Sequence, residues 1–144
     1  MLIFNKRGKF LLELEDDNIK GHKLAGANFR RAFLRGANFR FADLRGVDLY
    51  RADLKGVDLT WANLQGAVLE GANLTKAILF DADLQGANLA GARLRGVNLS
   101  RACLTNANLR CAHLEDADLD GVDLRGADLR GANLKGTILE GLKL

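Results

Sequence analysis

A period of five residues constrains the fold of this chain more than any other feature of its sequence. Over residues 36–74 the sequence repeats a small apolar residue, then Asp or Asn, then Leu or Phe, then two variable residues. We call the Leu or Phe the centre and number the other positions from it, so the small residue is at minus two. Centres recur at every fifth position over residues 24–144, and all of them are Leu except Phe29 and Phe39.

This period fits neither a helix, whose apolar residues recur every three or four positions, nor a plain strand, which alternates every two. In an extended segment the minus-two residue and the centre point to the same side, and the minus-one residue points to the other. The two variable residues must then turn the chain, so four repeats close one coil. We therefore predict an all-β fold, a quadrilateral parallel β-helix of about six to seven coils with a filled interior.

The glycines support a corner between successive repeats. Apart from Gly8, every glycine in the chain occupies the plus-two position. A type II turn requires a positive φ at its third residue, which favours glycine. Where Arg31, Phe41, Arg51 or Trp61 takes this position, we expect a different corner without a positive φ. Asp or Asn at minus one is expected to bond the backbone near the corner.

Residues 1–11 lie outside the repeat and read as a short hairpin with a glycine-containing turn. We predict two parts, an N-terminal capping segment over 1–11 and a pentapeptide-repeat β-helix over 12–144. The cap would cover the open edge of the first coil and bury Phe33, and the alternative is an arm that binds a partner. An open edge at the other end makes an end-to-end homodimer a further hypothesis.

Composition indicates a soluble domain of 144 residues with 27% charged residues and a formal charge of +3. No apolar run approaches the ~20 residues of a membrane span. The first residues do not resemble a signal peptide, so we expect a cytoplasmic protein without membrane contact. Cys103 and Cys111 have no metal or redox spacing and fit free thiols in a reducing compartment.

The repeat resembles the motif A-[DN]-L-x-x of the pentapeptide repeat family, as in Ala42-Asp43-Leu44, over residues 22–144 clearly and 12–144 loosely. The resemblance implies a right-handed coil and supports its square section. The family includes many cyanobacterial proteins without known activity. It also includes quinolone-resistance proteins that mimic DNA and bind gyrase, and these have a strongly acidic surface and a C-terminal extension.

Residues 20 apart should be stacked neighbours, so surface columns can be identified. Phe41 and Trp61 form one such pair at a corner, and Ile78 and Phe80 lie one coil further along the same side. Together these four residues would form an exposed apolar strip, the best candidate for a protein contact. The alternative is that the aromatic rings stack on each other and shield the corner backbone.

A basic ring surrounds one of the first coils, with one arginine on each side. Its members are Arg30, Arg35, Arg40 and Arg45. A nucleic-acid site would concentrate its charge on one face, so nucleic-acid binding is not expected. Acids that could offset the ring are Asp43, Asp48, Asp53 and Asp58. The acidic residues over 115–123 could pair with Arg95, Arg101 or Lys135.

No residue pattern predicts catalysis. The sequence has no nucleophile–base pair or phosphate loop, and one His with two distant Cys does not make a tetrahedral metal set. We predict a non-enzymatic protein without cofactor, catalytic residues or metal, acting as a scaffold for a protein partner that the sequence does not identify. The alternative, implied by the resemblance, is a DNA-mimic inhibitor of gyrase, against which the basic charge counts.

Overall fold

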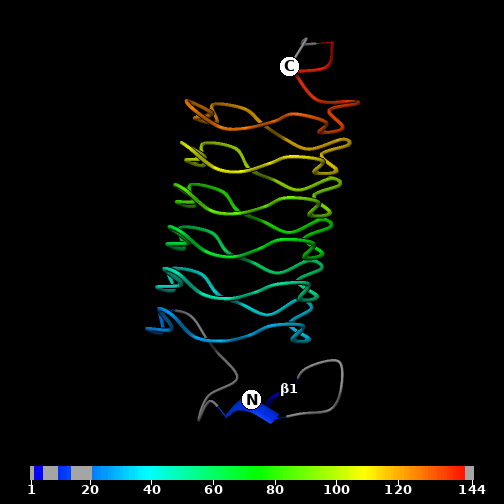
Figure 1. Ribbon diagram of the computed structural model, residues 1–144. Coiled ribbons are helices and arrows are strands. Elements are labelled where there is room, and N and C mark those ends of the chain that lie inside the picture. Colours follow the sequence, from blue (N-terminus) through cyan, green and yellow to red (C-terminus); the bar gives the residue numbers. More distant parts are fainter. Residues whose placement is uncertain (1, 5–9, 14–20, 142–144) are drawn as a thin grey trace.

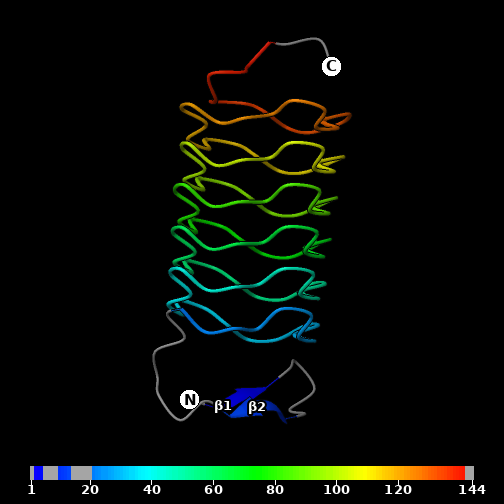
Figure 2. The ribbon, with the colours of Figure 1, turned by 90° about the vertical axis from the view of Figure 1, so that its left-hand side faces the viewer.

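The computed structural model describes residues 2–4, 10–13 and 21–141. Two short strands, β1 (Leu2–Phe4) and β2 (Phe10–Glu13), pair antiparallel with an irregularity between Ile3 and Phe4. Figures 1 and 2 both draw this hairpin beyond the N-terminal end of a stack of coils. The hairpin agrees with the expectation for this segment, whereas its role as a cap and the boundary at residue 11 remain predictions. The weak repeats over 14–20 lie outside the described residues.

Parallel bridges between residues 20 apart hold the coils together. Each side of a coil contributes one bridge, because only three residues lie between two corners and no longer strand can form. One column of bridged residues runs through Lys23, Asp43, Asn63, Asp83, Cys103 and Asp123. Four pentapeptides therefore make one coil, as predicted, and nearly six such coils are stacked over residues 21–136. Figure 1 shows the resulting rod.

Backbone hydrogen bonds run between coils on every side of the rod. The N–H of Leu54 donates to the C=O of Asn73 at 2.8 Å, and the N–H of Asn73 donates back to the C=O of Ala52 at 2.9 Å. At the corner, the N–H of Gly56 donates to the C=O of Thr75 at 3.0 Å. Each coil thus satisfies the backbone of its neighbour, which makes stability a sum of contacts along the stack.

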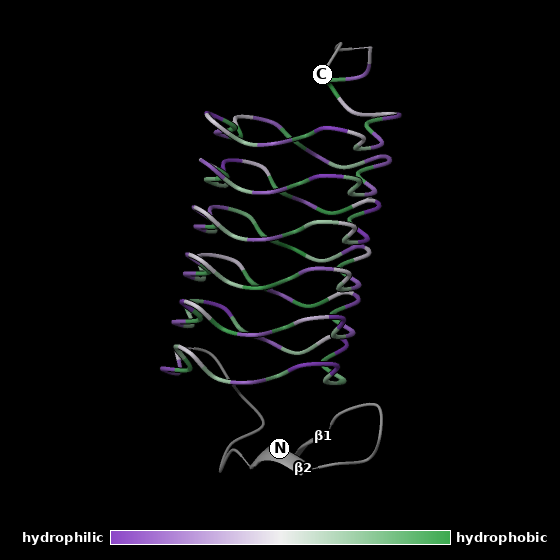
Figure 3. Cartoon of the chain, in the orientation of Figure 1, coloured by the Kyte–Doolittle hydropathy of each residue, from purple (hydrophilic) through white to green (hydrophobic). Residues whose placement is uncertain are grey.

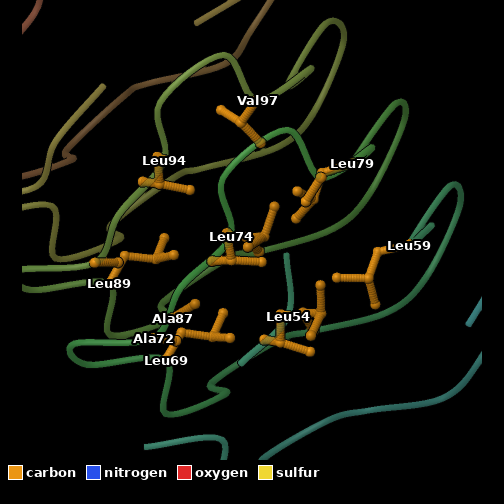
Figure 4. Close-up of a cluster of buried hydrophobic side chains, with 14 of the residues drawn as sticks. Leu54, Leu59, Leu69, Ala72, Leu74, Leu79, Ala87, Leu89, Leu94 and Val97 are labelled. Carbon is orange, nitrogen blue, oxygen red and sulfur yellow. The ribbon is translucent and has the colours of Figure 1, made fainter. Parts of the chain in front are cut away.

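The interior is filled by the minus-two residues and the centres. Between Phe39 and Leu119 none of them is more than 5% exposed. Figure 4 shows Leu54, Leu74 and Leu94 one above another on successive coils. In Figure 3 hydrophobic and hydrophilic residues alternate along each coil, as the inward and outward positions of the repeat require. The predicted division between an apolar interior and a polar exterior is confirmed.

The prediction of a different corner at non-glycine positions is wrong. The φ angles of Arg31, Phe41, Arg51 and Trp61 are 56°, 60°, 52° and 59°. Ten non-glycine residues share this left-handed conformation: Arg31, Phe41, Arg51, Trp61, Lys76, Asp81, Arg101, Asn106, Cys111 and Asp116. Every corner from Gly21 to Gly136 therefore has the positive φ of a type II turn, with or without glycine.

Hydrogen bonds on both sides of the corner explain this uniformity. The N–H of Phe41 donates to the C=O of Thr60 in the next coil at 3.0 Å, and the N–H of Ala42 closes the turn on the C=O of Phe39 at 3.0 Å. A left-handed non-glycine residue costs about 1–2 kcal/mol. A corner of another shape would lose these bonds and shift the next repeat out of register, so the stack imposes one conformation.

Short polar side chains at minus one brace the corners, as expected. The Oδ1 atoms of Asp48 and Asn38 accept hydrogen bonds from the backbone N–H groups of Tyr50 and Arg40, at 3.0 and 3.1 Å. The same bond recurs along the rod wherever such a residue precedes a centre, for example from Arg110 to Asn108 at 3.1 Å. Asx bonds of this kind stabilise turns locally.

The repeat over 137–141 leaves the stack at its C-terminal end. Ile138 is 72% exposed and forms no bridge with a described residue. Local bonds form here, from Thr137 Oγ1 to the C=O of Leu134 at 2.7 Å and from the N–H of Gly136 to Glu140 Oε2 at 2.8 Å. The five-residue pattern thus continues over 137–141 without the stacking that it shows in the preceding repeats. Residues 142–144 lie outside the described part, and end-to-end association remains a prediction.

Candidate functional site

The aromatic strip predicted from the sequence begins with two stacked corner residues. The ring centroids of Phe41 and Trp61 lie 5.3 Å apart, and the ring planes meet at 84°. This edge-to-face arrangement is favourable for aromatic pairs. The two side chains remain 42% and 52% exposed, so the contact does not hide them from solvent. Both interpretations of the pair, mutual stacking and an accessible surface, are therefore compatible with the geometry.

Ile78 and Phe80 extend the strip into the next coil. The backbone N–H of Trp61 donates to the C=O of Phe80 at 3.0 Å, which fixes the two residues as neighbours. The side chain of Ile78 is 42% exposed, and Phe80 is partly buried. The structure thus brings the four predicted residues to one side of the rod and the corner that follows it.

Arginines border this strip at both ends. The guanidinium carbon of Arg40 lies 5.5 Å from the ring centroid of Phe41, and that of Arg101 lies 5.4 Å from the ring centroid of Phe80. Arg101 also pairs with Asp81 at 3.1 Å. Such cation–π contacts hold the rings in place, and because both arginines are also paired with aspartates, they give the apolar surface a polar border without net charge. An apolar centre with a polar rim is typical of protein interfaces.

Each arginine of the basic ring is paired with a carboxylate. Arg30, Arg35 and Arg40 reach the next coil, and their closest contacts are to Asp48 at 2.8 Å, Asp53 at 2.6 Å and Asp58 at 3.2 Å. The exception is Arg45, which pairs with Asp43 of its own repeat at 2.6 Å. The equivalent position in the next coil is Asn63, which carries no charge. The predicted offset by acids is confirmed.

The ion pairs of the ring shift the pKa values of their members. Hydrogen bonding to Arg45 lowers the pKa of Asp43 to about 2. Hydrogen bonding to Asp48 raises the pKa of Arg30. Burial acts to raise the pKa of Asp58, but hydrogen bonds from Thr60 and Arg40 together lower it. The ring is therefore a set of ionised pairs and presents little uncompensated positive charge.

The acids over 115–123 are spread around a corner and the sides next to it. Asp116 lies 3.5 Å from Arg95, as predicted, and Glu115 lies 3.6 Å from His113. The other two predicted partners are not used, because Arg101 pairs with Asp81 and Lys135 forms no ion pair among residues 21–141. These acids therefore do not form one continuous acidic face.

The remaining candidate residues do not assemble into a reactive centre. Cys103 Sγ lies 3.3 Å from Thr105 Oγ1, and Cys111 is exposed; both are free thiols. Phe33 is 52% exposed, so its predicted burial is wrong. Within the described ranges, no group of His, Cys, Asp and Glu could hold a metal ion. No helix in this part of the chain could cross a membrane.

A groove of about 510 Å³ was not predicted from the sequence. It lies beside a corner where two glycines are stacked, Gly71 and Gly91, and the arginines that line it are Arg35, Arg51 and Arg93. The missing side chains of the glycines leave the space open. The corner column at 20-residue spacing, Arg31, Arg51, Gly71 and Gly91, indicates the open space but not Arg93, which belongs to another column. We call this feature the arginine groove.

Comparison with protein families places the repeats in a known group. The family model described as pentapeptide repeats matches in 8 copies over residues 23–60, 52–79, 77–110 and 107–144. No curated protein matches the chain.

Several solved structures are similar to this chain. The pentapeptide repeat protein Rfr23 from the cyanobacterium Cyanothece 51142 is 32% identical, with 82% of this chain and 88% of that chain covered and a TM-score of 0.52. A pentapeptide repeat protein from the Arabidopsis thaliana thylakoid lumen is also 32% identical, with 88% and 70% covered and a TM-score of 0.45. QnrB1, a plasmid-mediated fluoroquinolone resistance protein, shares the fold at 22% identity, with 85% and 68% covered and a TM-score of 0.61. The chain belongs to the pentapeptide repeat family.

Proposed function

We propose that this protein is a non-enzymatic scaffold that binds a protein partner through the aromatic strip, on a coil with the right hand expected for the family. One observation carries the proposal. Of the five large hydrophobic residues that are exposed in the described part of the chain, three belong to the strip: Phe41, Trp61 and Ile78. Exposed apolar side chains that gather in one place mark interaction sites more often than scattered ones.

The composition of the strip suits a binding surface. Trp and Arg are enriched among the residues that contribute most to protein interfaces, and Trp61 is the single Trp of the chain. Because the coils are about 4.8 Å apart, the strip offers apolar contacts at a regular spacing. The ion-paired arginines at its ends form a polar rim around this apolar centre, an arrangement typical of protein interfaces.

Affinity capture with the purified protein and a host lysate tests this proposal. A protein retained by the wild type and lost from Trp61→Ala, as measured by quantitative mass spectrometry, would support the strip. Phe33→Ala is the matched control, because Phe33 has the same exposed fraction of 52% and lies on another side. Equal capture by all three proteins would contradict the proposal.

Inhibition of gyrase by DNA mimicry is the second candidate function. The similarity to QnrB1 concerns the fold alone and does not favour it. The formal charge of +3 and the ion pairs of Asp116 and Asp123 count against an acidic DNA-like surface. A supercoiling assay separates the two candidates, since dose-dependent inhibition of gyrase would favour mimicry over the scaffold.

A further inference from the structure

We propose that the arginine groove binds an extended acidic segment of a protein, whose carboxylates pair with Arg51 and Arg93. The groove lies away from the aromatic strip, at the opposite corner of the coil. Its volume of about 510 Å³ and its polar lining suit a charged ligand rather than an apolar one. This inference does not depend on the function proposed for the strip.

Two of the three arginines in the groove have no carboxylate partner. Arg35 is taken up by Asp53, whose carboxylate is only 4% exposed and also lies 3.4 Å from the amide nitrogen of Asn73. Arg51 and Arg93 form no ion pair with any residue over 21–141. The guanidinium of Arg51 instead lies 5.1 Å from the ring centroid of Tyr50. The groove thus has an excess of positive charge, unlike the basic ring.

The position of Arg93 is itself unusual. It occupies a minus-one site, where Asp or Asn is the regular residue, and it forms a parallel bridge with Asn73 below and His113 above. It also lines a second hollow of about 320 Å³ with Thr75, Arg95, His113 and Glu115, whose carboxylate lies 3.6 Å from His113. The Arg93 side chain is exposed, and a guanidinium offers a planar pair of donors that suits a bidentate contact with a carboxylate.

The spacing of the two arginines favours an extended peptide. Arg51 and Arg93 belong to coils two steps apart, which corresponds to about 10 Å at the usual distance between parallel strands. One small anion does not span this distance, whereas acidic side chains three residues apart in an extended polyproline II segment do, because this conformation has three residues per turn and rises about 3.1 Å per residue. Gly91 leaves room for the backbone of such a segment, because a Cβ atom there would meet nothing within 4 Å, whereas the Arg51 side chain lies over Gly71.

A nucleic acid is a poorer match for the groove. Binding of a duplex by its phosphates typically uses about 6–10 contacts to Lys or Arg. The groove offers two arginines without a carboxylate partner, and the arginines of the basic ring are already paired. The acidic peptide is therefore the ligand that the charge pattern supports best.

Fluorescence anisotropy with a labelled peptide tests the proposal. The probe is a short Ser/Thr peptide with Glu at every third position, and the matched peptide carries Gln at those positions. We expect the Glu peptide to bind, the Gln peptide not to bind, and the double variant Arg51→Gln/Arg93→Gln to bind about tenfold more weakly. Rising salt should weaken binding, because the contacts are exposed charges.

Two control variants keep the test specific. Arg31→Gln removes one positive charge from the same corner column but outside the groove, so it should bind the peptide as the wild type does. Trp61→Ala changes the aromatic strip and should also bind the peptide as the wild type does. Circular dichroism confirms that each variant is folded. Absence of binding by the wild type, equal weakening by Arg31→Gln, or tighter binding of duplex DNA than of the peptide would overturn the proposal.

Discussion

Two corners of the same rod show that the backbone conformation stays constant while the side chains on the surface change. At one corner Phe41 and Trp61 are stacked, and at the opposite corner Gly71 and Gly91 are stacked. The φ angles are 60° and 59° at the aromatic corner and 63° and 61° at the glycine corner. The backbone is thus nearly the same, while one corner presents two rings and the other leaves a groove.

The reason is that hydrogen bonds between coils determine the corner. The N–H of Trp61 donates to Phe80 at 3.0 Å, and the N–H of Gly71 donates to Ala90 at 2.9 Å. Glycine adopts the left-handed conformation without cost, and the other residues adopt it at about 1–2 kcal/mol because the stack requires it. Surface chemistry can therefore vary from corner to corner without a change in the fold.

The largest expected effect comes from the interior that both corners share. Leu74 is fully buried, so Leu74→Ala should lower the free energy of unfolding by about 2–5 kcal/mol in urea denaturation. Leu139→Ala is the matched control, since Leu139 is only partly buried in the repeat that leaves the stack, and should cost clearly less. Equal losses would mean that corners rather than the interior hold the coils together.

Gly91→Phe should turn the glycine corner into an aromatic one. A Cβ atom at Gly91 would meet no other atom within 4 Å, so the expected loss of about 1–3 kcal/mol comes from the left-handed backbone alone. The circular dichroism spectrum should stay unchanged, and binding to the arginine groove should be lost. Unfolding of this variant at room temperature would show that the two corners are not interchangeable.

The contact between Phe41 and Trp61 should contribute a smaller amount. A double-mutant cycle of Phe41→Ala and Trp61→Ala is expected to give a coupling energy of about 0.5–1.5 kcal/mol from thermal or urea unfolding. The same cycle with Phe33→Ala in place of Phe41→Ala should give no coupling, because Phe33 lies on another side. A coupling energy near zero for both pairs would show that the two rings do not stabilise each other.

Lowering the pH should have the smallest effect on the stability of the fold. The pKa of Asp43 is lowered from 3.8 to about 2 by Arg45, so this ion pair stabilises the folded state above pH 3.8 and loses its contribution as the pH falls towards 2. Melting temperatures of the wild type should therefore fall more steeply over this range than those of Asp43→Asn. Parallel curves for the two proteins would show that the exposed pair does not affect stability.

Much of the fold and part of the site could be predicted from the sequence. The spacing of Ala42 and Leu44 identifies inward-facing residues, because two positions in an extended chain share one side. The 20-residue coil then places Phe41 under Trp61 without further information. The arginine groove was missed because its partners, Arg51 and Arg93, are 42 positions apart and belong to different columns.

What the sequence by itself determined is which side chains enter the interior, since that depends only on the period of five. The tertiary structure alone decided three other features: the positive φ at Phe41 and Trp61, the pairing of Arg45 with Asp43, and the departure of residues 137–141 from the stack. Each of these depends on the coil above or below. At the corners, backbone contacts with a neighbour 20 residues away override local preference, because they satisfy N–H and C=O groups that one repeat cannot satisfy by itself.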